Sequence, residues 1–257
     1  MNQFVLFIFL LSFVFQSACT SGRPAAEDVT ANDRALALID ERNYEQAIQL
    51  LKLELEKNPA NSETRILLAS ALAGKNGVVM TRFTQLARTL IEKNQTQPAA
   101  NSKKWQGLEW QLKLARSAFE GIPTLRNGEA YQDLTTALQV LIESADSPGI
   151  HLFRAILRLV IFKYEITHPY KLEFHEGCMV DIKPLHAWFN KVTSNLQSLV
   201  ADLLGGVKDQ KSQDDLEKLY AKIMKARESI EDTFAMFDEN GVTDAPKIIR
   251  KFYGACE

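Results

Sequence analysis

The sequence predicts an all-α protein built from antiparallel helical hairpins, arranged as a stack or a helical bundle. From about residue 31 onward, apolar residues recur at steps of three and four positions, which places them on one face of an α-helix. No stretch alternates apolar and polar residues for long enough to predict a strand. Several of the 12 glycines and 8 prolines stand between leucine-rich stretches, which argues against a turn-rich all-β chain.

Residues 1–18 have the pattern of an export signal peptide. The chain carries no charged side chain between Asn2 and Ala18, and its apolar run from Phe4 to Phe15 spans 12 residues. A helix needs about 20 apolar residues to cross a bilayer, so this run is too short to span one. The pattern therefore favours a removable signal.

Cys19 resembles the lipidated cysteine of bacterial lipoproteins. Two small residues, Ser17 and Ala18, precede it as in the lipobox of that class, although Gln16 replaces the usual aliphatic residue. The resemblance implies that Cys19 is acylated and anchors the protein in a membrane. Two or more acyl chains in one leaflet make such an anchor stable. Thr20 resembles the sorting pattern for the outer membrane, with the domain facing the periplasm. The alternative is an ordinary cleaved signal and a secreted or soluble periplasmic protein.

Residues 19–30 are predicted to form the lipid-anchored tether and residues 31–257 the helical domain. The tether consists of small, proline and acidic residues without an apolar period. The whole chain has 30 basic and 32 acidic residues, so it lacks the excess of positive charge that favours nucleic-acid binding. We expect no nucleic-acid partner.

The first predicted helical pair covers residues 35–59 and has the spacing of a compact hairpin. Small residues stand where two antiparallel helices approach most closely, larger ones fill the layer between them, and an Asn-Pro pair ends the second helix. The residues that carry this pattern are Ala35, Tyr44, Ala47, Leu51 and Pro59. The segment resembles a tetratricopeptide repeat (TPR). Residues 62–77 resemble the first helix of a second repeat, so the clear match covers about residues 28–75, with an ordinary αα-hairpin as the alternative.

Five further amphipathic stretches and one short closing stretch predict the rest of the domain. They are residues 102–119, 128–145, 150–164, 184–206, 212–237 and 244–253. Turn residues separate them, among them Pro123, the Ser147-Pro148-Gly149 run and the Gly205-Gly206 pair. Ser212 and Asp215 predict a capping box at the start of the last long helix. The helix over 150–164 is apolar almost all round, which predicts a central position.

The TPR resemblance implies a concave helical surface that binds extended peptides or partner helices. Members of that family that bind a peptide carboxylate use a Lys and an Asn on the first helix of a repeat. Asn32 and Leu36 stand at those positions, so this clamp is not supported. Arg154 and Arg158 could contact an acidic partner, but paired charges on a buried helix are the more frequent explanation.

Candidate metal ligands and one of the two candidate disulfide cysteines fall in one predicted loop. The side chains of His168, His175, Cys178 and His186 are of the kind that binds zinc, although their spacing is not that of a known zinc motif. Cys178 and Cys256 are candidates for a disulfide in an oxidising compartment, and two buried thiols are the alternative. We expect no metal ion or other cofactor.

The sequence as a whole predicts a non-catalytic envelope lipoprotein that acts as an interaction adaptor or scaffold for envelope proteins or peptides. No phosphate-binding glycine loop and no nucleophile motif are present. The alternative is a periplasmic helper that binds a small ligand or assists a transporter, with Trp105, Trp110 and Trp188 lining a pocket.

Overall fold

The computed structural model describes residues 29–79, 83, 119–168, 179–181, 183–235 and 242–244. Within these residues the fold is all-α, as predicted, apart from two three-residue strands. The helices are α2 (Ala31–Asp40), α3 (Tyr44–Lys57), α4 (Ser62–Lys75), α7 (Gly128–Ile142), α8 (Pro148–Thr167), α9 (Lys183–Gly206) and α10 (Gln210–Ala235). The strands are β1 (Met179–Asp181) and β2 (Val242–Asp244).

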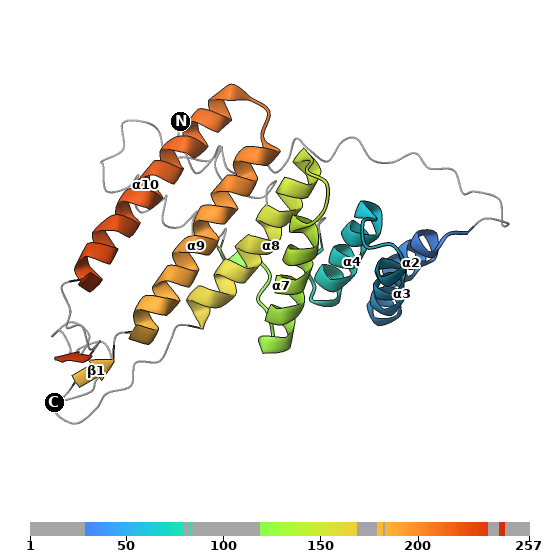
Figure 1. Cartoon of the computed structure of the whole chain (residues 1–257), viewed down its shortest axis with the longest axis horizontal. Coiled ribbons are helices and arrows are strands. Elements are labelled where there is room, and N and C mark those ends of the chain that lie inside the picture. The colour runs from blue at the N-terminus through green and yellow to red at the C-terminus, as the bar shows by residue number, and fades with distance from the viewer. Residues whose placement is uncertain are drawn as a thin grey trace.

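The helices lie side by side in the order of the chain, and each packs against the next one described (Figure 1). α2 also packs against α4, so the first three helices form a compact group. Short connections make α2, α3 and α4 antiparallel to one another, as they do α7 to α8 and α9 to α10, while the apolar stripe of each helix is buried against its neighbours. The molecule is therefore an extended row of helices, with α2 and α3 at one end and α10 at the other.

Polar side chains fix the points at which the helices begin. Thr30 and Asp33 form a reciprocal capping box at the start of α2, in which the Thr30 side chain accepts a hydrogen bond from the Asp33 backbone at 3.2 Å. Asn61, Asn127 and Ser147 cap α4, α7 and α8 in the same way, each accepting from the backbone N–H three residues on. These caps supply partners for N–H groups that a helix start otherwise leaves unpaired.

The core of the first group depends on small residues at the helix crossings. Ala35 of α2 and Ala47 of α3 are fully buried, and Leu51 fills the space beside them. Tyr44 packs directly on Gly74 of α4, because a Cβ atom added at Gly74 would lie 2.5 Å from the Tyr44 ring. Ala35 and Ala47 are thus buried, as the pattern of small residues in this hairpin predicts.

α8 is the central helix of the described part, as its apolar composition predicts. Residues 152–157 are buried in an unbroken run, which requires neighbours on several sides of the helix. α7 packs against one side and α9 against another. α8 nevertheless carries three buried charged side chains, Arg154, Lys163 and Glu165, each of which needs a partner.

α10 differs from its prediction in its start and in its burial. The helix begins at Gln210, and Asp209 rather than Ser212 caps it, with the Ser212 backbone donating to Asp209 at 3.0 Å. Hydrogen bonds from the Ser212 side chain and backbone hold the pKa of Asp209 below its usual value. Leu216 is buried on α10, but Ala226, predicted to be buried, is exposed. α10 packs on α9 at the end of the row, which leaves most of its surface in solvent.

The prediction of a short closing helix over residues 244–253 is wrong at its first residue. Asp244 lies in β2, which pairs antiparallel with β1 so that Met179 stands opposite Asp244. The rest of that prediction, residues 245–253, lies outside the described residues, as does most of the predicted helix over 102–119.

Candidate functional site

The side of α2 that faces α4 continues into an exposed surface, which we call the inner surface. Thr64 of α4 donates a hydrogen bond to the Asn32 side chain at 2.9 Å, which fixes the neighbouring turns of α2 and α4. Leu36 lies one turn after Asn32 on the same face of α2 and is 48% exposed. Ile66 and Leu67 of α4 are partly buried against the core. Neither Asn32, which bonds within the fold, nor the apolar Leu36 forms a carboxylate clamp.

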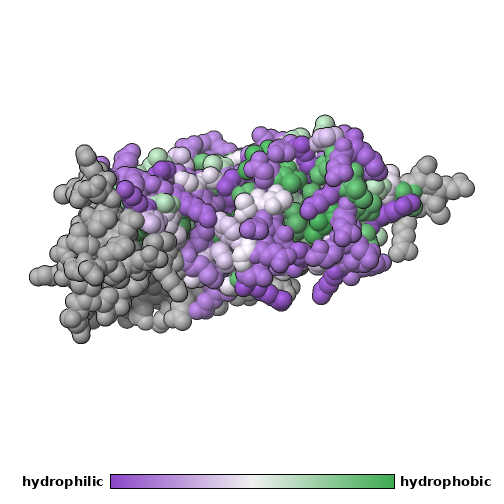
Figure 2. All heavy atoms as spheres, turned by 60° about the horizontal axis from the view of Figure 1, so that its bottom comes forward, coloured by the Kyte–Doolittle hydropathy of each residue, from purple (hydrophilic) through white to green (hydrophobic). Residues whose placement is uncertain are grey.

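The side of α3 that faces away from α4, which we call the end surface, carries the exposed apolar residue Leu53 among the exposed polar residues Gln46, Gln49 and Glu56. Leu53 follows Tyr44 by nine positions, about two and a half helical turns, so the two side chains point in opposite directions. Tyr44 contacts α4, and Leu53 therefore faces away from it and is 55% exposed. Figure 2 shows apolar side chains gathered around α4 and its neighbours, bordered by polar ones.

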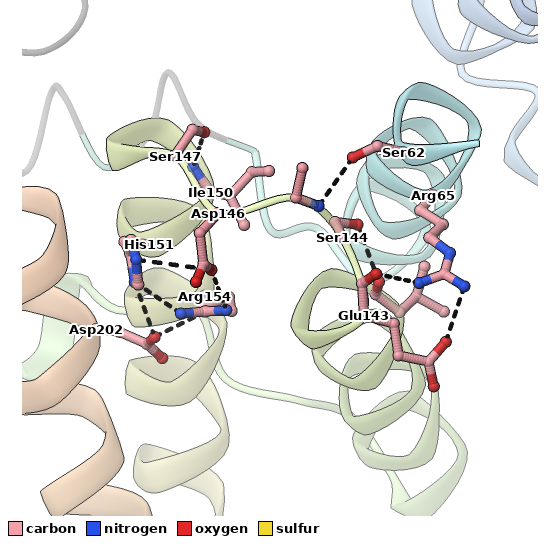
Figure 3. A network of polar contacts seen from close by, with 12 residues as sticks. Ser62, Arg65, Glu143, Ser144, Asp146, Ser147, Ile150, His151, Arg154 and Asp202 are labelled. Carbon is pink, nitrogen blue, oxygen red and sulfur yellow. Dashed lines mark hydrogen bonds and ion pairs between the residues drawn. The ribbon is translucent and has the colours of Figure 1, made fainter. Parts of the chain in front are cut away.

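A cluster of charged side chains joins α8 to α9 (Figure 3). Asp202 of α9 accepts a hydrogen bond from Arg154 Nε at 2.7 Å on Oδ1 and one from Arg158 Nε at 2.7 Å on Oδ2. The side chain of Asp202 is 6% exposed, and those of Arg154 and Arg158 are 11% and 16% exposed. This confirms that the two arginines are paired within the fold. Asp202, their shared partner, was not identified from the sequence.

His151 extends this cluster to the turn between α7 and α8. Arg154 Nη2 lies 2.7 Å from His151 Nδ1, and because a guanidinium can only donate, Nδ1 acts as the acceptor. The imidazole proton is thereby assigned to Nε2, which lies 3.7 Å from Asp146 Oδ1. A Cβ atom added at Gly205 would lie 2.6 Å from His151 Nδ1, so α9 approaches the imidazole closely because Gly205 has no side chain.

The same turn is also tied to α4. The Ala145 backbone N–H donates to Ser62 Oγ at 3.2 Å, and Arg65 Nη2 forms an ion pair with Glu143 at 3.3 Å. Arg65 also donates to the backbone carbonyl of Glu143. These contacts connect the first group of helices with the α7–α8 turn (Figure 3).

At the other end of α4 and α7, Lys75 joins three helices. Its ammonium group lies 3.0 Å from Asp133 and 3.3 Å from Glu129, both on α7, and 3.1 Å from Glu45 on α3. The hydrogen bond to Asp133, followed by that to Glu45, raises the pKa of Lys75 above its usual value. The position of α7 against α3 and α4 is therefore fixed electrostatically as well as by packing.

A second buried carboxylate lies where α7, α8 and α9 meet. Glu165 is 5% exposed and accepts hydrogen bonds from the Tyr131 hydroxyl at 2.8 Å and from Asn195 Nδ2 at 3.3 Å. Its backbone carbonyl accepts a hydrogen bond from Trp188 Nε1 at 3.0 Å. Lys191 Nζ lies 3.6 Å from Glu165 Oε1 and 4.7 Å from the centre of the Tyr131 ring. This group combines a carboxylate, a phenol and an ammonium.

Burial and charge shift the pKa values of this group. Burial, more than any other cause, raises the pKa of the Tyr131 hydroxyl. Partial burial alone would lower the pKa of Lys191, but the interactions with Tyr131 and Glu165 together raise it. Burial lowers the pKa of Lys163, two positions before Glu165 on α8, whose ammonium donates to the Ile122 carbonyl at 2.6 Å. Lys191 remains a cation beside the buried carboxylate.

The predicted metal-binding histidines that the structure describes make other contacts. His168 lies at the exposed end of α8, where its ring stacks on Tyr164 with centres 4.1 Å apart. His186 Nε2 pairs with Glu231 of α10 at 2.6 Å. The remaining donors, His175 and Cys178, lie outside the described residues. Among the residues that the structure does describe, no three His, Cys, Asp or Glu side chains are grouped so as to hold a metal ion.

Of the other predicted site residues, the structure describes one and leaves the rest outside its described ranges. Cys19, Cys256 and two of the tryptophans, Trp105 and Trp110, lie outside it, so lipidation and the disulfide stay predictions. Trp188 is described and is half-buried between α8 and α9. No helix in the described ranges is long and apolar enough to cross a membrane.

Comparison of the chain with protein-family models, with curated proteins and with solved structures finds no match in any of the three.

Proposed function

We propose that the protein is a bacterial envelope lipoprotein whose helical domain acts as a non-catalytic adaptor or scaffold. Its partners are envelope proteins or peptides that bind on the inner surface of α2 and α4. The observation that carries this proposal is the combination at that surface of a fixed helix pair and an exposed apolar residue. Asn32 and Thr64 hold the two helices together, while Leu36 remains 48% exposed beside them.

The order of helix contacts supports the same proposal. In a stack of helical hairpins each element packs mainly against its sequence neighbours, and the resulting long surface binds partners along its length. The described helices follow this rule from α2 to α10, and the additional contact of α2 with α4 is the one expected between the first helices of successive TPR units. The resemblance to a TPR thus makes the inner surface the concave, partner-binding side.

The location in the envelope is proposed from the N-terminal sequence. Nine residues lie between Cys19 and Val29, where the described part begins, so the ten steps of an extended tether allow the domain to lie up to about 35 Å from the bilayer. We place the lipid anchor in the outer membrane, with the domain in the periplasm. Cys19→Ala should abolish fatty-acid labelling and release the protein from membranes. A labelled, membrane-bound Cys19→Ala protein would contradict this location.

The adaptor role is tested by crosslinking the full-length protein in its native envelope and identifying the captured proteins by mass spectrometry. Leu36→Lys places a charge on the inner surface, and Leu53→Lys places the same charge on the end surface. We expect Leu36→Lys to lose reproducible partners that the wild type and Leu53→Lys retain. Equal capture by all three proteins, each with wild-type helix content, would refute binding at the inner surface.

A further inference from the structure

The proposed adaptor function makes no use of the buried group around Glu165, although this group has the composition of a ligand site. A carboxylate that is 5% exposed is costly unless it is paired, and Lys191 supplies the cation. The two members of this ion pair, Glu165 and Lys191, differ in how firmly the protein holds them. Tyr131 and Asn195 fix the carboxylate by hydrogen bonds, whereas the Lys191 side chain is 56% exposed.

The surroundings of the Lys191 ammonium are those that proteins use to recognise alkylammonium compounds. The group lies 4.7 Å from the centre of the Tyr131 ring, within the range of a cation–π interaction. The ring is itself supported by Tyr164, with centres 5.0 Å apart. The ammonium also lies 3.6 Å from Glu165 Oε1, the oxygen that accepts the hydrogen bond of the Tyr131 hydroxyl, a separation that gives attraction without a short hydrogen bond. An aromatic ring and a carboxylate therefore both interact with one partly exposed positive charge.

We propose that Tyr131 and Glu165 form a binding site for small alkylammonium ligands, which Lys191 occupies in the free protein. An incoming primary ammonium replaces the Lys191 ammonium against the ring and the carboxylate, and the displaced side chain moves into solvent. Glu165 is thus paired with a cation both in the free protein and in the complex. This inference does not depend on the adaptor function.

The test is a titration of the isotope-labelled protein with n-butylammonium, followed by NMR. We expect saturable shifts of resonances around Tyr131 in the wild type. Binding to Lys191→Ala should be about tenfold tighter, because the competing intramolecular ammonium is gone. Lys208→Ala, which removes an exposed lysine elsewhere, serves as the matched control and should bind like the wild type. Uncharged n-butanol should not produce the shifts.

Two variants test which groups form the site. Glu165→Gln removes the negative charge, and Tyr131→Leu removes the aromatic face, so each should weaken butylammonium binding. Circular dichroism of each variant checks that it is folded, and either variant suffices if the other unfolds. The proposal is overturned if the wild type shows no saturable binding, if butanol binds equally well, or if folded Glu165→Gln or Tyr131→Leu binds like the wild type.

Discussion

Replacing Asp202 by alanine removes the one carboxylate shared by Arg154 and Arg158. Arg154 keeps a contact with Asp146 at 3.4 Å, whereas the Arg158 guanidinium has no other partner within the described residues. Both guanidinium groups are largely buried, at 11% and 16% exposure. The variant therefore leaves two cations between α8 and α9 without the anion that compensates them.

The expected cost follows from this geometry. Breaking a buried ion pair by removing one partner costs about 3–5 kcal/mol. We expect the lower end, about 3 kcal/mol, because Arg154 retains Asp146 and both arginines keep some contact with water. That change corresponds to a decrease of about 150-fold in the folding equilibrium constant. It should appear as a large fall in the urea midpoint.

Urea unfolding followed by circular dichroism measures this change. The matched control is Asp232→Asn, an exposed substitution on α10, which should change the free energy of unfolding by less than about 0.5 kcal/mol. Replacing the whole cluster, with both arginines as methionine and Asp202 as leucine, should recover much of the lost stability. A loss below about 1 kcal/mol in Asp202→Ala would show that this cluster does not stabilise the α8–α9 pair.

Three further predictions concern the other contacts between helices. Gly205→Ala should destabilise the protein by about 1–3 kcal/mol, because the added Cβ would lie 2.6 Å from the His151 ring. Gly128→Ala is the control, since a Cβ there meets no atom within 4 Å, and it should be neutral or stabilising. Thermal melts compare the two variants. Lys75→Met should lower the free energy of unfolding by about 1–2 kcal/mol in urea titrations, since three carboxylates lose their shared cation. An unfolding midpoint equal to that of the wild type would contradict the claim that Lys75 stabilises the contact of α7 with α3 and α4. The folded-state pKa of Asp209 lies below its unfolded value of 3.8, so its contribution is complete above pH 3.8 and is lost as the pH falls through the folded-state pKa. Asp209→Asn should lack this part of the acid sensitivity, and identical acid-unfolding curves for the two proteins would count against the cap.

The helices that begin at strong local signals could be predicted from the sequence. Asn127 followed by Gly128 marks the start of α7 where it was predicted. The Ser147-Pro148-Gly149 run was predicted as a turn before a helix from Ile150, but Ser147 caps α8 and Pro148 and Gly149 are its first two residues. The end of α9 at Gly206 matches the predicted stop. These signals work because a cap satisfies backbone groups within a few residues of itself, so the information is local.

The differences arise where a distant part of the chain decides the outcome. Asp244 follows a helix-like pattern, but it pairs with Met179, 65 positions earlier, and the backbone is extended there. Ala226 lies on the apolar stripe of α10 yet is exposed, because α10 is the last helix of the row and has α9 on one side. A periodic pattern shows which face of a helix is apolar but not how much of it a neighbour covers.

The site residues show the same limit. Arg154 and Arg158 could be recognised from the sequence as charges on a buried helix that need a partner. Their partner, Asp202, lies 48 positions from Arg154 and 44 from Arg158 and interrupts an apolar stretch of α9, which was its one visible signal. Glu165 shows no such local signal, since its partners Tyr131 and Asn195 come from two other helices.

The central claim is that the inner surface of α2 and α4 binds partner proteins, and site-specific photocrosslinking tests it most directly. A photoreactive benzophenone amino acid is placed at Leu36 on the inner surface or at Leu53 on the end surface, two positions of similar exposure, 48% and 55%. Illumination of intact cells should give discrete crosslinked protein products from position 36 and few or none from position 53. Products from position 53 alone, or no products from position 36 in folded, membrane-anchored protein, would contradict the claim.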